Sequence, residues 1–310
     1  MKTLGMLLVL AAVGLGACEK GTPAPAPITQ QSAPAVKTAG EAYASIYNSL
    51  SKAATSVDVT QGGQDAVLQE HASQIEQLIE QSKVDDADFG VQYDEGFLAE
   101  MPHLGQTRAF ARLLTADAKR AIAAGDMDGA CKRIAAVLRI ATQVAKPART
   151  EIELLVAAAI SNLSTKLVID SPTLAQAAWK TDVQNALVGA TDTIVTRSFG
   201  PVEKEFDMTI RDLRANKIPD LSSKEFGEMG KNWPAATAAE REDAAKNLEA
   251  LKGEIKQVWN APDAIEKIKS AIKARESKAG SDLVANVWKV RKAVNEAKEE
   301  MAKAASVLNK

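Results

Sequence analysis

The sequence predicts an all-α fold, a multi-helix bundle of antiparallel helical hairpins that ends in a coiled-coil-like segment. Beyond residue 40, apolar side chains recur at helical spacing, and no segment shows the sustained period-two alternation of a strand. Each proline in this part falls between two such segments, because proline removes a backbone donor and clashes inside a helix. These prolines are Pro102, Pro147, Pro172, Pro201, Pro219, Pro234 and Pro262.

Residues 1–17 have the pattern of a secretory signal peptide. A basic start at Lys2 precedes an apolar run that is shorter than the roughly 20 residues a helix needs to cross a bilayer. The run ends in the four residues Leu15, Gly16, Ala17 and Cys18. This motif resembles the lipobox of bacterial lipoproteins. The resemblance implies cleavage before Cys18 and a diacylglycerol on its thiol, whereas the alternative is an ordinary signal peptide with an incidental cysteine.

Residues 18–40 are predicted to form the lipidated start and a tether. The stretch GTPAPAPITQQSAPAVKTAG is rich in Ala, Pro, Thr and Gln and lacks the residues that a core needs. A chain of this composition spans roughly 25–70 Å. The lipobox resemblance implies attachment to a membrane of the cell envelope through Cys18. Glu19 stands where an Asp would signal inner-membrane retention, which favours the outer membrane, facing the periplasm.

Residues 41–216 are predicted to form an α-helical domain. Gly125 and Asp126 fit a tight turn between two helices, with the glycine in a left-handed conformation and the aspartate as an N-cap. Thr150 and Glu153 have the T-x-x-E spacing of a capping box. The segment that follows, EIELLVAAAISNLSTKLVI, is apolar nearly all round, which predicts a central buried helix.

The chain has two cysteines, and the lipid on Cys18 leaves Cys131 without a partner. Cys131 lies on an apolar helical stripe, which favours a buried side chain over a reactive thiol. The fold is therefore not expected to depend on a disulfide.

The helical pattern lapses over residues 217–236, which we predict to be an irregular linker. Residues 237–310 are predicted to form a helical hairpin or coiled-coil-like segment, because apolar residues from 283 to 308 repeat every 3.5 residues. The stripe at 244–258 has the same spacing and is the favoured partner within the chain. The alternative partner is a second copy, so the 283–308 heptad stripe could also support an oligomer.

Residues 65–215 resemble an uncharacterised family of exported bacterial all-helical proteins. The resemblance rests on the stretches MPHLGQTRAFARLL, AIAAGDMDGACKRIAAVLRIA and TEIELLVAAAI, although Met101 stands where the family usually has Leu. That family has no established activity, so the resemblance implies a helical fold and no reaction.

Two histidines limit the chemistry available to the chain. His71 lies on an apolar stripe, which favours a half-buried structural role. His103 follows a proline at a predicted helix start, close to Glu100, and a histidine with carboxylates can bind a divalent metal ion. The spacing of Glu100 and His103 matches no defined metal site, so a helix-capping or loop-bonding histidine is favoured and no cofactor is expected.

Three arginines, Arg108, Arg112 and Arg120, share a predicted helix. They could line a groove for an anionic ligand, but the favoured interpretation is an ion-paired face against the acidic residues 41–100.

The sequence contains no catalytic or nucleotide-binding motif. Nucleic acid is not an expected partner, because the export signal places the chain in the wrong compartment and aromatic residues make up only 4% of it. We therefore expect a non-enzymatic helical interaction module of the cell envelope with an envelope protein as partner. The alternatives are a small-ligand or lipid-binding helical protein and a metal-dependent enzyme centred on Glu100 and His103.

Overall fold

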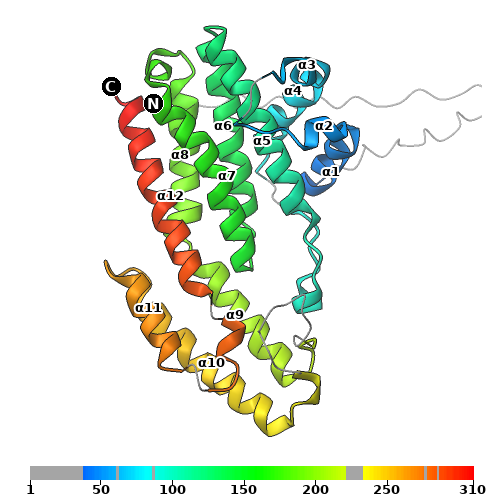
Figure 1. The fold of residues 1–310 in the computed structure, drawn as a ribbon, viewed down its shortest axis with the longest axis vertical. Helices are drawn as coiled ribbons and strands as arrows, with labels where there is room; N and C mark the ends of the chain where they lie inside the picture. The colour runs from blue at the N-terminus through cyan, green and yellow to red at the C-terminus, as the bar shows by residue number, and fades with distance from the viewer. Residues whose placement is uncertain (1–37, 61–62, 86–87, 221–232, 276–277, 285) are drawn as a thin grey trace, which may run out of the picture. The chain divides into compact units, whose positions relative to one another are not determined.

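The all-α prediction is confirmed by a computed structural model, which describes residues 38–60, 63–85, 88–220, 233–275, 278–284 and 286–310 (Figure 1). Within these ranges there are helices and no strand. The helices are α1 (Ala39–Ser49), α2 (Lys52–Thr55), α3 (Asp65–Glu70), α4 (Ala72–Gln81), α5 (Pro102–Ala123), α6 (Met127–Ala145), α7 (Glu151–Asp170), α8 (Lys180–Ala190), α9 (Phe199–Arg214), α10 (Ala238–Val258), α11 (Ala264–Lys273) and α12 (Val287–Leu308). All of them belong to one compact unit, Lys37–Lys310.

Short helical segments join several of these helices. They are the 3-10 helices η1 (Tyr93–Leu98), η2 (Pro172–Gln176), η5 (Trp233–Ala235) and η6 (Ser281–Val284), and the π-helix η3 (Thr191–Thr196). The predicted turn between α5 and α6 is present: Gly125 has φ 79°, and Asp126 accepts a hydrogen bond from the Gly129 amide at 2.8 Å.

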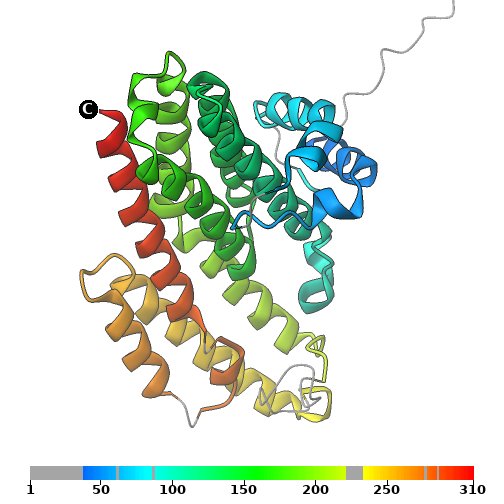
Figure 2. The same cartoon turned by 45° about the horizontal axis from the view of Figure 1, so that its top comes forward.

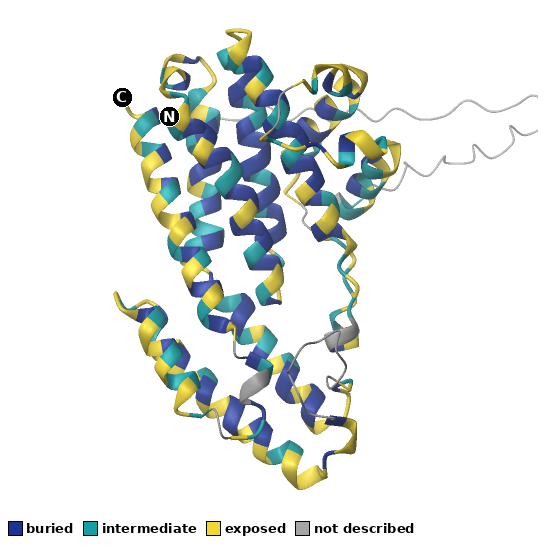
Figure 3. Ribbon diagram, viewed as in Figure 1, coloured by how far each residue is buried: buried dark blue, intermediate teal, exposed yellow. Residues whose placement is uncertain are grey.

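The core is built around α6 and α7. Helix α6 packs against α5, α7 and α8, while α7 also packs against α5 and α12. Figure 3 shows buried residues along α6 and α7 and exposed ones along the outer faces of α10 and α11. Helix α7 has the length and hydropathy of a membrane-spanning helix, but most of it is buried by its neighbours, as the all-round apolar pattern predicted for a core helix.

The heptad stripe of α12 is buried within the chain, but its partner differs from the predicted one. Val290, Val294 and Met301 are buried, and α12 packs mainly against α7. Figures 1 and 2 both show α12 running beside the α7 and α8 region. Helix α10, which carries the 244–258 stripe, packs instead against α9 and α11. The first residue of the stripe, Leu283, lies in η6 rather than in α12.

Two predicted boundaries fall partly outside the described residues. Helix α1 begins at Ala39, within the stretch assigned to the tether, because Thr38 and Glu41 form a capping box. The linker predicted at 217–236 is described only at its two ends, where Ile218 and Trp233 are buried. Residues 221–232, the signal peptide and Cys18 lie outside the described residues.

Candidate functional site

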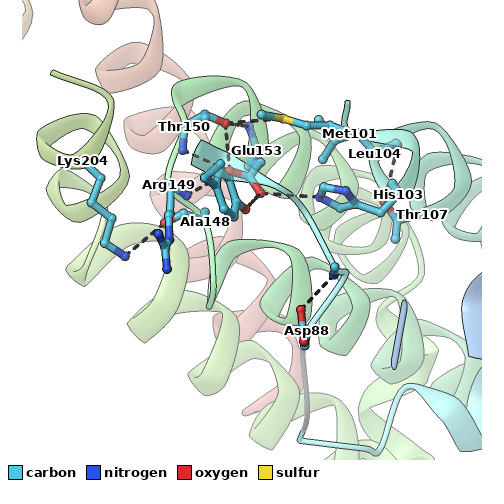
Figure 4. A network of polar contacts seen from close by, with 12 residues as sticks. Asp88, Met101, His103, Leu104, Thr107, Ala148, Arg149, Thr150, Glu153 and Lys204 are labelled. Carbon is cyan, nitrogen blue, oxygen red and sulfur yellow. Dashed lines mark hydrogen bonds and ion pairs between the residues drawn. The ribbon is translucent and has the colours of Figure 1, made fainter. Parts of the chain in front are cut away.

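His103 is buried at the start of α5, and the carboxylate that faces it is not the predicted one. Its side chain stacks on Phe89, with ring centroids 4.5 Å apart, and its Nε2 lies 3.5 Å from Glu153 Oε1 (Figure 4). Neither ring nitrogen of His103 makes a hydrogen bond with a described residue. Glu100 is exposed, so the structure pairs His103 with α7 rather than with Glu100.

Glu153 is the centre of this cluster. Its Oε2 accepts hydrogen bonds from the Arg149 amide at 2.9 Å, from the Thr150 amide at 3.0 Å and from Thr150 Oγ1 at 2.8 Å. Its Oε1 accepts one from the Tyr93 hydroxyl at 2.5 Å. The capping box predicted at Thr150 and Glu153 is therefore confirmed. Its acidic member also anchors η1, which brings Tyr93 to α7.

The electrostatics of the cluster favour an ionised Glu153. Burial raises the pKa of this carboxyl, but the nearby His103 ring and the hydrogen bonds from Tyr93, Arg149 and Thr150 together hold its pKa below the ordinary value. Burial and the bond to Glu153 raise the pKa of Tyr93, which stays a neutral donor. Tyr93, Arg149 and Thr150 thus all donate to this one carboxylate.

Two shallow pockets lie on either side of Tyr93 and Arg149. One is about 320 Å³ and also borders Lys204 and Arg211, and the other is about 410 Å³ and borders Phe89. The Arg149 guanidinium lies over the Tyr93 ring at 4.9 Å, and Lys204 Nζ donates to the Ala148 carbonyl at 3.4 Å (Figure 4). Tyr93 and Arg149 thus form the wall between the pockets.

No group of three or more His, Cys, Asp or Glu side chains in the described part of the chain is arranged to hold a metal ion. The second histidine, His71, is buried and its Nε2 lies 2.8 Å from Ser51 Oγ, the N-cap of α2.

A buried aspartate, Asp117, forms a second polar cluster that the sequence interpretation did not single out. Its carboxylate pairs with Arg120 on α5 at 2.6 Å and with Arg133 on α6. Arg120 therefore meets an acid of its own helix rather than the acidic 41–100 region. Arg133 also lies 3.5 Å from Glu76, which does belong to that region. The i, i+3 spacing of Asp117 and Arg120 was a visible signal, but nothing nearby in the sequence pointed to Arg133.

The Cys131 thiol is expected to be unreactive in the folded protein. Its side chain is fully buried, and burial raises the pKa of the thiol to about 11, so almost no thiolate is present at neutral pH. Labelling with a maleimide at pH 7.5, read by mass spectrometry, should be slow in buffer and complete in denaturant. Rapid labelling of native protein carrying Cys18→Ser would contradict this assignment.

No family model, curated protein or solved structure matches the chain.

Proposed function

We propose that the protein is a lipid-anchored envelope protein that acts as a non-enzymatic helical interaction module. The observation that carries the proposal is the Leu15-Gly16-Ala17-Cys18 motif after a short apolar run, followed by an Ala/Pro-rich tether. A resemblance to a lipobox implies an anchor at Cys18, and the outer membrane facing the periplasm is the expected location. An envelope protein is the expected partner.

The buried polar groups in the described helices support a non-enzymatic role. Glu153 joins η1 to α7, and Asp117 joins α5 to α6. Both carboxylates are occupied by contacts between neighbouring elements. A catalytic acid or base must instead be able to reach a substrate.

The anchor is tested by acylation of the two cysteines. Cells that express the protein with an alkyne-labelled palmitate are expected to label the wild type and Cys131→Ser, and to leave Cys18→Ser unlabelled. Cys131 is the matched control because it is the chain's other thiol and is buried. Equal labelling of Cys18→Ser and the wild type would contradict the proposal.

The interaction role is tested separately from the anchor. Crosslinking in intact cells, followed by mild detergent extraction, should recover one envelope protein at constant stoichiometry with the wild type. A chain that remains monomeric and recovers no partner would argue against the module while leaving the anchor intact.

A second candidate function, binding of a lipid or another apolar small molecule, is favoured by a groove between α8 and α12. The groove is about 600 Å³, within the roughly 300–1,000 Å³ typical of ligand sites. Its wall includes Val188, which is 70% exposed, and the π-helix η3, a type of helix often found at functional sites.

Filling this groove tests the second candidate. Ala302→Trp should abolish binding of a fluorescent long-chain fatty acid, whereas Val84→Trp, at an exposed position outside the groove, should not. Equal binding by both variants, or no binding by the wild type, would remove this candidate.

A further inference from the structure

The apolar groove between α8 and α12 contains one positive charge that no acid of the described residues neutralises. Two of the side chains that line the groove are ionisable, Asp192 and Lys298. Asp192 pairs with Arg197 at 2.8 Å, whereas the Lys298 ammonium group forms no ion pair or hydrogen bond with a described residue. The groove therefore offers an unpaired cation beside an apolar surface.

Two contacts across the groove show how its walls run. The side-chain amide of Gln184, on α8, donates to Asn309 Oδ1 at 2.9 Å, and the hydroxyl of Thr191, in η3, donates to Met301 Sδ at 3.3 Å. The residue number thus rises along one wall while it falls along the other, so the two walls are antiparallel. Lys298 therefore lies toward the η3 end of the groove, and Asn309 lies at the opposite end.

The wall between these two ends is apolar. Along α12, the distance from Lys298 to Asn309 is roughly 16 Å at the helical rise of 1.5 Å per residue, which an extended acyl chain of medium length can cover. A ligand that lies along this wall removes apolar side chains from water, which favours its binding. These side chains are Leu187, Val188, Met301, Ala302 and Ala305.

We propose that the groove binds a fatty acid, with its carboxylate at Lys298 and its acyl chain along α12 toward Asn309. This inference rests on the second candidate function above, and it adds the class of ligand and the direction in which the ligand lies. A carboxylate carries one negative charge, which matches one ammonium group. A dianionic phosphate would bring a second negative charge close to Asp192, so a carboxylate is the favoured head group.

Calorimetric titration of the full chain with decanoate and with decanol tests the proposal. All chains carry Cys18→Ser, so that no lipid anchor requires a detergent that would compete for the groove. Lys298→Gln should raise the Kd of decanoate by about tenfold, the effect of losing one charge-assisted hydrogen bond. It should leave the Kd of decanol unchanged, because decanol has no charge. Lys298→Glu should weaken decanoate further, since it places an anion beside the carboxylate.

Lys303→Gln is the matched control. Lys303 lies on the same helix but does not line the groove, and it pairs with Glu300 at 2.8 Å. This variant should bind both ligands as the parent chain does. Ala302→Trp should abolish the binding of both, because it fills the groove.

The possible failures separate this inference from the function on which it rests. If the parent chain bound neither ligand, the second candidate function would be removed and this inference with it. If Lys298→Gln bound decanoate as tightly as the parent chain, or weakened decanoate and decanol equally, only the carboxylate position would be overturned. Full binding of decanoate by Ala302→Trp would place the ligand outside the groove and would overturn both.

Discussion

Asp117→Ala is expected to lower the free energy of unfolding by about 3–5 kcal/mol, because it removes the buried carboxylate that pairs with two guanidinium groups. Asp117 is fully buried, and only 14% of the Arg133 side chain is exposed. Removing the acid leaves Arg133 with only the longer contact to the exposed Glu76, and it removes the ion pair of Arg120. Urea denaturation followed by circular dichroism at pH 7 measures the loss.

Glu76→Ala provides the control for the same arginine. The Glu76 side chain is 65% exposed and lies 3.5 Å from Arg133, so its loss should cost less than about 1 kcal/mol. If the two alanine variants were equally stable, the buried ion pair would contribute no more to stability than the exposed one. Asp117→Asn, which keeps the shape of the side chain, should fall between the wild type and Asp117→Ala.

Glu153→Ala is expected to lower the free energy of unfolding by about 2–4 kcal/mol, through the loss of a helix cap and of the acceptor for the partly buried Tyr93 hydroxyl. The carboxylate is fully buried and accepts bonds from Thr150 and Tyr93. Tyr93→Phe removes only one of these bonds, so it should cost about 1–2 kcal/mol. If Tyr93→Phe were as unstable as Glu153→Ala, the main contribution of Glu153 to stability would be its bond to Tyr93 of η1 rather than the helix cap.

The pH dependence gives a second measure of Glu153. Its pKa is lower in the folded protein than the ordinary 4.5, so its contribution to stability is complete above pH 4.5 and is lost as the pH falls through the folded value. The difference in stability between the wild type and Glu153→Gln should therefore be largest near neutral pH and shrink in acid. A difference that grows in acid would contradict the assignment.

Local patterns in the sequence predicted the parts of the fold that depend on neighbouring residues. The Thr150 and Glu153 capping box, the turn at Gly125 and the buried Cys131 helix follow from spacing and propensity within one or two turns. The partner of His103 could not be predicted in this way, because Glu153 lies 50 positions further along the chain and reaches it only through the packing of α5 on α7.

Choosing the partner of a helix is harder than recognising the helix. The 283–308 stripe has the period of a coiled coil, and that period does not specify which apolar surface covers it. Helix α7 is apolar nearly all round, so it presents a face to α5, α6 and α12 at once. The 244–258 stripe offers a single face, and α10 packs against α9 and α11.

The packing of α12 on α7 has a consequence for the order in which the chain can fold. During synthesis, α5, α6 and α7 emerge one after another and can form their mutual contacts early, since these contacts are local in sequence. One face of α7 stays uncovered until α12 follows. The bond from Thr191 of η3 to Met301 of α12 likewise joins residues that are 110 positions apart. A nascent chain would therefore expose an apolar surface until its last helix is made, and this interval is when it most needs protection from aggregation.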